Sequence, residues 1–573
     1  MAESPWPGDR TLPAISLDEA LDAVRTAVLD RRSEDAIPLL SHLTDELPGS
    51  PEIRYWLFSA LTQLGLQDEA DQAFRQAISL HAMHTMQESG VEMERYLNDA
   101  EYAEMVGDSY YSIRAPAIAA VAFERALQLN GPTTELIKFY ALALHHQGHS
   151  EEAATVFRGA AEAYGSTVFN QFLLFTLFFT KGGVKGYSEE AKRWAATYAP
   201  AHPDVLTIPT DPAGRKLRIG YVAPSFSRSQ IAQFIGPVLA AHDPEAVEVI
   251  LYTAALADED PLPCDRIVEI GELTDDEATS VIRADNLDIL VDVWGHTAGS
   301  RMHIFAHRAA PVQVAWINFV QTTGLTTMDY VLHSDSMDAP GTDALFTETI
   351  WRMGEITIPY RPADNRPPPS PTPALANGYV TFGSFNNPSK LSAETIAAWS
   401  AIVRGRPESR LLLKYGVFAD PVIKRMVQAK FAAHGVDPAR ILFEGHSTGH
   451  DYLESFSRLD LALDPSPCPG GTTTCDALSN GVPVLTLAGD NFYSRIGIQG
   501  VAVAGLPDLV AESWDDYVAK ALAVTADLDT LTALRDRVRP GFEASAMRDE
   551  IGFTRRLEGV FRQMAERQYA SQG

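Results

Sequence analysis

The chain has 573 residues, enough for about three domains at roughly 100–200 residues each. Its hydrophobic content of 46% is that of a packed globular protein and excludes a wholly disordered chain. Acidic residues outnumber basic ones by 75 to 46, giving a formal net charge of -29. Such a field repels phosphate backbones, so we expect no nucleic-acid partner.

The N-terminal segment MAESPWPGDR has neither the basic region nor the apolar region of a secretory signal. The most apolar stretch, Phe172–Phe179, is far shorter than the ~20 residues that cross a bilayer. We therefore expect a cytoplasmic protein with no membrane partner. The three cysteines, Cys264, Cys468 and Cys475, lack the spacing of a disulfide framework or a zinc site, so no metal is expected.

A repeat occupies residues 1–200. Triplets of a small, a bulky and a small or apolar residue recur with a shift of 34 residues, except for one shift of 49 that contains a 15-residue insertion. The triplets are Ala36/Leu40/Leu43, Ala70/Phe74/Ala77, Ala119/Phe123/Ala126 and Ala153/Phe157/Ala160. Small residues let paired helices approach closely, and the bulky residue fills the gap between them. The period resembles that of the tetratricopeptide repeat, and we expect this α-helical array to bind an acceptor protein; the alternative is a purely structural array.

A proline-rich linker at Pro200–Leu217 ends the repeats, and strand-length apolar runs then alternate with helical segments. The predicted strands are Arg218–Pro224, Glu248–Ala254, Leu287–Trp294, Val312–Ile317 and Asp329–Ser334. A second linker, Pro359–Gly378, contains seven prolines, which a sheet interior does not tolerate. The alternation predicts a doubly wound, Rossmann-like lobe with a parallel sheet at residues 216–375.

A second set of alternating elements follows at residues 377–541. Its predicted strands are Tyr379–Phe385, Arg410–Gly416, Arg440–Gly445, Leu459–Pro465 and Pro483–Gly489. Residues 542–573 are predicted to form a helical tail. Ligands of such sheets bind beyond the carboxyl ends of the strands, so the polar segments that follow the strands are the candidate site. Two such lobes in sequence are the plan of nucleotide-sugar transferases of the GT-B type, although a fold alone does not determine a function.

Two segments of the second lobe are suited to hold a phosphate. Lys390 follows a predicted strand and is suited to neutralise a phosphate, and Asn387 adds an amide donor. The second segment, Gly470, Gly471, Thr472 and Thr473, lies between a strand and a helix predicted to start near Thr474. Glycine permits close backbone approach, and the unpaired N–H groups of a helix start attract anions. The alternative is ordinary capping of that helix.

Three further residues complete the candidate site. Asp476 lies in the first turn of that predicted helix, where a carboxylate accepts hydrogen bonds from ribose hydroxyls in other nucleotide folds. Tyr452 follows a strand and is suited to stack on a base; packing against its own helix is an equal alternative. In the first lobe, His296 follows a strand, and its ordinary pKa suits a general base, while a structural histidine is the alternative.

Several motifs in order resemble the O-GlcNAc transferase family, glycosyltransferase family 41. They are RIGYV, WGHTAGSR, FAHRAAPVQVAW, SFNNPSKL, TTTCDAL and GVPVLTLAGDNFYSR, and the resemblance covers about residues 51–568. It implies a GT-B fold, inversion at the sugar carbon without a metal, and Ser or Thr side chains of proteins as acceptors. It also implies that Lys390 holds the leaving diphosphate, that Asn387, Thr472, Thr473 and Asp476 contact phosphate or sugar, and that Tyr452 stacks on the base.

The chain departs from the family on the side of the donor sugar and acceptor. The family's Asp-Phe-Gly-x-His segment reads Ser225-Phe-Ser-Arg228-Ser229 here, and its His-Thr-Thr begins with Gly471. Thr322 follows another first-lobe strand and faces the same predicted cleft. Arg228 is suited to pair with a carboxylate on a donor sugar, such as a nonulosonic acid. In plan the chain is similar to bacterial flagellin glycosyltransferases that use CMP-activated nonulosonates.

We therefore predict a cytoplasmic protein O-glycosyltransferase that uses a nucleotide sugar as co-substrate and needs no other cofactor. Its candidate catalytic residues are Lys390 and His296, with Ser225, Arg228, Ser229 and Thr322 on the donor-sugar or acceptor side. The favoured donor is a CMP-nonulosonate and the favoured acceptor is flagellin. Two alternatives stay open: transfer from UDP-GlcNAc or another UDP-hexose, and a non-catalytic repeat scaffold.

Overall fold

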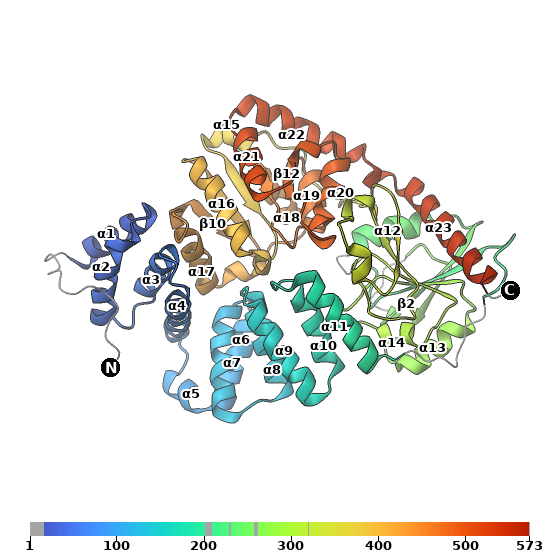
Figure 1. The fold of residues 1–573 in the computed structure, drawn as a ribbon, viewed down its shortest axis with the longest axis horizontal. Coiled ribbons are helices and arrows are strands. Elements are labelled where there is room, and N and C mark those ends of the chain that lie inside the picture. Colours follow the sequence, from blue (N-terminus) through green and yellow to red (C-terminus); the bar gives the residue numbers. More distant parts are fainter. Residues whose placement is uncertain (1–15, 201–208, 228–230, 257–261, 319, 572–573) are drawn as a thin grey trace. The chain divides into compact units, whose positions relative to one another are not determined.

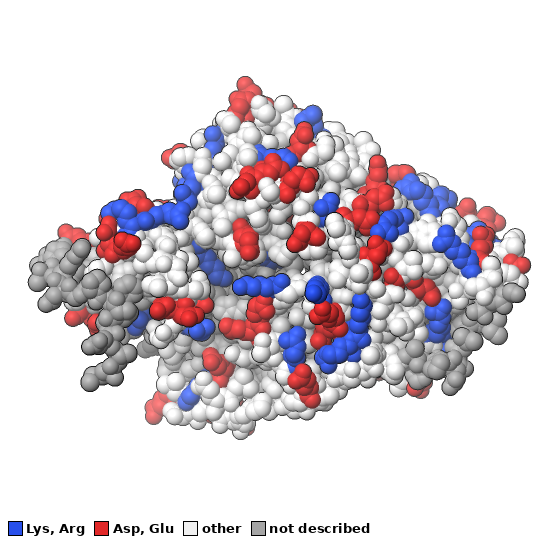
Figure 2. Space-filling model, viewed as in Figure 1, with Lys and Arg blue, Asp and Glu red and all other residues white. Residues whose placement is uncertain are grey.

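The computed structural model describes residues 16–200, 209–227, 231–256, 262–318 and 320–571 (Figure 1). The chain divides into two compact units. The first consists of residues 1–147 together with 393–446, and the second of residues 148–392 together with 447–573. Within the described ranges, no helix has the length and apolar character needed to span a membrane. Basic and acidic side chains are interspersed on the face drawn in Figure 2, so the acidic excess does not form a single field there.

Among its described residues, from 16 onward, the first unit contains eight helices of the repeat region and a short α/β segment. The helices are α1 (Leu17–Leu29), α2 (Ser33–Glu46), α3 (Pro51–Gln63), α4 (Gln67–Glu88), α5 (Met93–Asn98), α6 (Ala100–Ser112), α7 (Pro116–Asn130) and α8 (Thr134–His146). The α/β segment consists of α16 (Ala393–Gly405), β9 (Arg410–Lys414), α17 (Pro421–Ala432) and β10 (Ile441–Glu444), and β9 and β10 pair in parallel.

The repeat continues into the second unit through α9 (Ser150–Tyr164), α10 (Thr167–Leu177) and α11 (Gly183–Tyr198). The four sequence triplets fall on α2, α4, α7 and α9, and none of their residues is more than 7% exposed. Gly65 and Gly148 follow α3 and α8 with φ of +76° and +91°, a backbone conformation that favours glycine. The 15-residue insertion lengthens α4 to 22 residues and adds α5. The predicted helical repeat is confirmed.

The second unit contains a parallel sheet of seven strands in the order β3-β2-β1-β4-β5-β6-β7. The strands are β1 (Leu217–Val222), β2 (Val247–Thr253), β3 (Arg266–Glu269), β4 (Ile289–Asp292), β5 (Val312–Ala315), β6 (Tyr330–His333) and β7 (Thr349–Arg352). They are interleaved with α12 (Ala232–Ala241), α13 (Asp275–Ala284) and α14 (Met302–Ala306). The apolar runs of β1, β4 and β5 are almost wholly buried, as expected for strands covered on both faces.

The same unit contains four further parallel strands in the order β8-β11-β12-β13. They are β8 (Thr381–Ser384), β11 (Leu461–Leu463), β12 (Val484–Leu487) and β13 (Val510–Ala511). The helices of this part are α15 (Pro373–Asn377), α18 (Gly449–Ser455), α19 (Thr472–Ser479), α20 (Ile496–Val503), α21 (Trp514–Val524), α22 (Leu528–Glu543) and α23 (Glu550–Ala570).

The predicted fold class, a helical repeat array followed by two parallel α/β lobes, is confirmed, and all ten predicted strands exist. No sequence pattern predicts β3, β7 or β13, because these strands are short and lack a buried apolar run. The C-terminal helix α23 returns to the first lobe, where it packs against α12 and β5 (Figure 1). There the Glu558 carboxylate accepts hydrogen bonds from the backbone N–H of Asp243 at 2.8 Å and contacts the His242 ring nitrogen at 2.9 Å.

Candidate functional site

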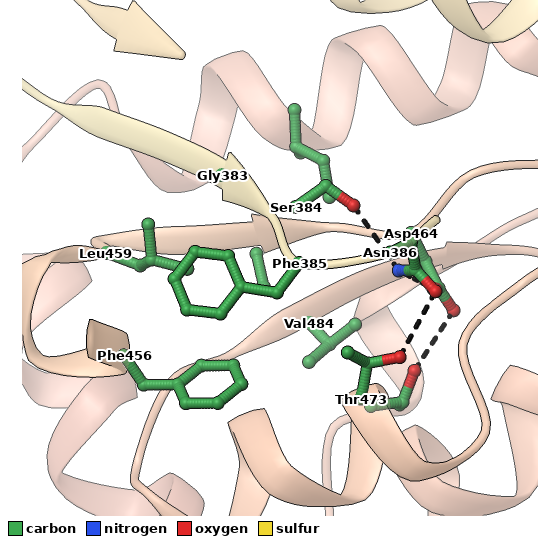
Figure 3. Close-up of a pocket in the computed structure, with 12 residues that line it drawn as sticks. Gly383, Ser384, Phe385, Asn386, Phe456, Leu459, Asp464, Thr473 and Val484 are labelled. Atoms are coloured by element: carbon green, nitrogen blue, oxygen red, sulfur yellow. Dashed lines mark hydrogen bonds between the residues drawn. The ribbon is translucent and has the colours of Figure 1, made fainter. Parts of the chain in front are cut away.

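The polar segments after β8 and β11 form one pocket, because these two strands are neighbours in the sheet. Phe382 of β8 pairs with Leu461 of β11, so the carboxyl ends of both strands lie at the same edge. Figure 3 shows that the pocket has an apolar side with Phe385, Phe456 and Leu459 and a polar side with Asn386, Asp464 and Thr473. A pocket of this mixed kind, at the carboxyl edge of a parallel sheet, is a typical ligand site.

Asn386 connects the polar groups of this pocket. Its side-chain oxygen accepts hydrogen bonds from the Lys390 ammonium and from the Thr473 hydroxyl, both at 3.1 Å. Lys390 also donates to the carbonyl oxygen of Pro469 at 2.8 Å. These contacts hold the ammonium, which has three N–H bonds, next to the start of α19. The sequence pattern predicts the neighbouring Asn387 instead, but the Asn387 side-chain oxygen accepts from the backbone N–H of Ser389 and shapes the turn that carries Lys390.

Asp464, directly after β11, is a site residue that the sequence motifs do not single out. Its carboxylate accepts from the Gly470 N–H at 2.6 Å and from the Thr486 hydroxyl at 3.1 Å. Burial raises the pKa of Asp464 to about 6, while the Gly470 N–H and the charge of Lys390 lower it. Burial has the opposite effect on the basic group, because it lowers the pKa of Lys390. The negative charge of Asp464 partly opposes this decrease. The signal available in the sequence was an acidic residue directly after a buried strand.

The helix start predicted to attract anions is present. Helix α19 begins at Thr472, two residues before the predicted position, and no side chain caps it. The backbone N–H groups of its first turn therefore have no partner within the helix. Gly471 is exposed, and a Cβ on it would meet nothing within 4 Å. Gly470 is different, because a Cβ there would lie 2.5 Å from the Thr474 hydroxyl oxygen, so the turn requires glycine.

Asp476 lies one turn into α19 and joins two tyrosines. One carboxylate oxygen accepts from the Tyr452 hydroxyl at 3.1 Å, and the other accepts from the Tyr360 hydroxyl. Burial raises the pKa of Asp476 to about 6, and these two hydrogen bonds oppose the shift. The Tyr452 ring also lies 6.4 Å from the Phe385 ring, at the apolar side of the pocket. Asp476 thus orients Tyr452 and is only 4% exposed.

Of the first-lobe candidates, His296 and Thr322 form hydrogen bonds to groups of their own lobe. His296 is wholly buried, its Nε2 lies 2.8 Å from the carbonyl oxygen of Thr323, and its ring meets Trp194 of α11 edge-on at 4.6 Å. Thr322 is buried and donates its hydroxyl hydrogen to Glu348 at 2.7 Å. Ser225 is half-buried in the loop after β1. Arg228 and Ser229 fall outside the described residues.

The burial of His296 predicts a pH dependence of stability. Desolvation lowers its pKa to about 4, against an ordinary value of ~6.5 in the unfolded chain. Between pH 6.5 and 4 the His296 ring binds a proton in the unfolded chain but not in the folded chain. The free energy of unfolding therefore falls as the pH falls. The His296→Gln variant keeps an N–H donor for Thr323. Over this pH range its free energy of unfolding should fall by about 3 kcal/mol less than that of the wild type.

The measurement is urea denaturation of both proteins at a series of pH values from 7 to 4. The His84→Gln variant, which replaces an exposed histidine, serves as the control and should follow the wild-type curve. Parallel curves for the wild type and His296→Gln would show that the His296 ring is protonated equally in both states.

No group of three or more His, Cys, Asp or Glu side chains that could hold a metal ion occurs in the described part of the chain. The arrangement at β8, β11 and α19 instead offers one ammonium, hydroxyl donors and backbone N–H groups. Such a donor set fits a phosphate or diphosphate, and the adjoining aromatic side fits a planar ring.

Known proteins resemble this chain in sequence and in fold. The family model described as Glycosyl transferase family 41 matches residues 201–353 and 372–557, which is more than half of the chain. A SPINDLY protein of Oryza sativa, named a probable UDP-N-acetylglucosamine–peptide N-acetylglucosaminyltransferase, is 36% identical over 365 residues. That match covers 62% of this chain and 39% of the rice protein.

Two further comparisons extend this result. A UDP-N-acetylglucosamine–peptide N-acetylglucosaminyltransferase of Caenorhabditis elegans is 22% identical over 477 residues, covering 62% of this chain and 41% of that protein. The solved structure of a mutant O-GlcNAc transferase from Thermobaculum terrenum has a TM-score of 0.75 and 26% identity, covering 98% of this chain and 100% of that one. The matches thus span about two fifths of the length of these curated relatives.

Proposed function

Because the chain belongs to glycosyl transferase family 41, we propose that it is a protein O-glycosyltransferase. It moves a sugar from a nucleotide-sugar donor to a Ser or Thr hydroxyl of an acceptor protein. The observation that supports this proposal best is the convergence of Lys390, Asn386 and Thr473 at the uncapped start of α19. A scaffold without activity has no use for such a phosphate-binding arrangement, and this disfavours the non-catalytic alternative.

In this mechanism the acceptor hydroxyl attacks the anomeric carbon from the side opposite the nucleotide. The new carbon–oxygen bond forms as the bond to the phosphate breaks, so the configuration inverts, and the hydroxyl proton leaves to a base. Negative charge grows on the departing diphosphate, where Lys390 and the first-turn N–H groups of α19 stabilise it. Donors that are already oriented toward the developing charge are often the largest contribution to catalysis, and they take the role that a metal has in other transferases.

The base is a separate part of the proposal. With a pKa near 4, His296 accepts a proton only weakly at neutral pH. In addition, Nε2 must carry a hydrogen, because its partner is the carbonyl oxygen of Thr323, which can only accept a hydrogen bond. These two facts favour a donor phosphate oxygen or a water molecule as the proton acceptor, with His296 holding the loop against α11.

The names of the relatives favour UDP-N-acetylglucosamine as donor over a CMP-nonulosonate. The CMP hypothesis depends on Arg228, a residue outside the described ranges, and flagellin as acceptor depends on the same hypothesis. Both stay predictions, as does a cytoplasmic location. The acceptor protein is expected to bind to the repeats.

The donor nucleotide can be identified by thermal shift with UDP, CMP and GDP at equal concentrations. A ligand that binds only the native state stabilises it, by about 2.7 kcal/mol at 100 times its dissociation constant. We expect UDP to raise Tm by several degrees and CMP to leave it unchanged. The Lys390→Ala variant is the control, since it should lose most of the shift. A rise with CMP alone would overturn the UDP assignment, and no shift with any nucleotide would contradict the proposed donor site.

A further inference from the structure

One face of helix α3 in the repeat region is occupied by the chain's own helix α17. This α3 face consists of five residues at helical spacing: Glu52, Tyr55, Trp56, Ser59 and Gln63. All five face α17 or the turn at its C-terminal end, and the contacts lie within one compact unit. The α3 face therefore shows what kind of ligand a helix of this array accepts.

The ligand in this contact is basic and helical. The guanidinium of Arg425 on α17 donates two hydrogen bonds to the Glu52 carboxylate, at 2.9 and 2.7 Å. The same guanidinium lies 5.2 Å from the Tyr55 ring centre and 5.4 Å from that of Trp56. A bidentate pair that also contacts aromatic rings is a specific mode of recognition.

Polar residues extend the contact along α3. The Ser59 hydroxyl donates to the carbonyl oxygen of Ala429 at 2.9 Å, and the Gln63 amide donates to that of Ala432 at 3.4 Å. Both acceptors are backbone carbonyls of the last turn of α17, and each accepts this side-chain hydrogen bond in addition to one from a backbone N–H, that of Ala433 or Gly435. The α3 face therefore binds the C-terminal turn of α17 as well as Arg425.

Helix α6 has a face at the equivalent positions, one repeat later. The sequence triplets of α4 and α7 are shifted by 49 residues, and helices α3 and α6 have equal lengths of 13 residues and the same shift. The five positions equivalent to the α3 face are Glu101, Glu104, Met105, Asp108 and Ser112, which we call the α6 face. On the opposite side, Ala103, Val106 and Gly107 are buried, and a Cβ on Gly107 would clash with Phe123. This packing fixes the rotation of α6.

The α6 face is open to solvent. Met105 is 52% exposed, and Glu101 and Asp108 are exposed as well. Within the described ranges, none of the three carboxylates on this face forms an ion pair. Desolvation, then the negative charges of Asp108 and Glu101, raise the pKa of Glu104. Like charges three and four residues apart destabilise a helix, so the acidic spacing does not serve the stability of α6.

We propose that the α6 face docks a basic amphipathic helix of another protein, in the way that the α3 face docks α17. Glu101 occupies the position equivalent to Glu52, which binds Arg425. Met105 occupies the position equivalent to Trp56, whose ring lies beside that guanidinium. Glu104 and Asp108 add negative charge that a second or third basic side chain of the helix would neutralise. The identification of that protein as the acceptor rests on the proposed function, whereas the docking itself does not.

A peptide of residues 420–437, which contains α17 with Lys424, Arg425 and Lys430, is the probe. It carries a fluorophore and is titrated with the full-length protein, and anisotropy reports binding. The test variant Glu101→Gln/Glu104→Gln/Asp108→Asn removes the charge of the α6 face. The control variant Asp45→Asn/Glu46→Gln/Glu69→Gln removes three exposed carboxylates elsewhere in the repeats. Melting curves confirm that both variants are folded.

We expect the test variant to bind the peptide at least tenfold more weakly than the wild type, and the control variant to bind it within twofold. Arg425→Ala in the peptide should weaken binding to the wild type to a similar degree. Equal affinities for the wild type and the test variant, or no binding to the wild type at 1 mM peptide, would overturn the proposal. A wild-type protein that forms dimers, lost in the test variant, would instead assign the face to a second copy of the chain and overturn a foreign partner.

The acceptor assignment is tested separately by steady-state kinetics. If the docked helix belongs to the acceptor, the test variant should raise KM for the protein acceptor at least fivefold and leave KM for the nucleotide sugar unchanged. Transfer activity with an unchanged acceptor KM would refute the acceptor assignment while leaving the proposed transferase intact. Absence of transfer in the wild type would refute the proposed function and leave the peptide result standing.

Discussion

Replacing Lys390 by alanine should lower kcat/KM for glycosyl transfer at least about 10³-fold. Removal of one donor that stabilises a developing oxyanion typically costs about 10²–10³ in kcat, and Lys390 supplies a full charge rather than a dipole. The ammonium is held by Asn386 and by the carbonyl oxygen of Pro469. Its removal leaves the start of α19 as the remaining positive end of the site. The measurement is incorporation of labelled sugar into the acceptor protein, with mass spectrometry of the product.

The control for this variant is Lys185→Ala, which removes an exposed lysine of α11 and should keep wild-type activity. The Lys390→Arg variant should restore only part of the activity, because a planar guanidinium does not reproduce the three-donor ammonium beside Asn386. A folded Lys390→Ala protein that glycosylates its acceptor at the wild-type rate would refute the catalytic model.

The Gly324→Ala variant should lower the free energy of unfolding by about 3 kcal/mol or more. Gly324 has φ of +77°, and a Cβ there would clash with the carbonyl oxygen of Ala191 on α11. The left-handed backbone conformation destabilises an alanine by about 1–2 kcal/mol relative to glycine. The clash with backbone atoms lowers the free energy of unfolding by about 1–3 kcal/mol more. The change affects the contact between the last helix of the repeat and the first lobe, where Tyr187 also donates to the Thr322 carbonyl.

The matched control is Gly341→Ala. Gly341 has φ of +83°, but a Cβ there would meet nothing within 4 Å. It therefore carries the backbone cost without the clash, and its free energy of unfolding should fall by only about 1–2 kcal/mol. Both variants are compared by urea denaturation. Equal losses would mean that α11 moves away from Gly324 at little cost.

Local patterns in the sequence predicted much of this molecule. The triplets around Phe74, Phe123 and Phe157 identify the paired helices, because close helix packing demands small residues at fixed spacing. Runs of apolar residues identify the central strands of both lobes, because a parallel sheet is covered on both faces. Lys390 and Thr473 are predictable because Lys390 lies past the end of a strand and Thr473 lies at the start of a helix, and the structure brings both together on Asn386.

The remaining features depend on contacts between distant parts of the chain. Asn386 and Asn387 are equally polar, and only the path of the loop decides which one turns toward Lys390. His296 looks like an available base in the sequence, whereas Trp194 of α11, about a hundred residues earlier, covers its ring. The grouping of residues 393–446 with the first repeats has no local signal, since it depends on pairs such as Arg425 with Glu52.

This grouping has a consequence for synthesis of the protein. Helix α3 leaves the ribosome about 370 residues before helix α17 is complete. At about 5–20 residues per second, the aromatic side chains of Tyr55 and Trp56 stay uncovered on the nascent chain for roughly 20–70 s. During that interval a chaperone or another basic helix can occupy the place of α17. The order of translation thus makes the earliest repeats a transient docking surface that disappears once α17 packs against α3.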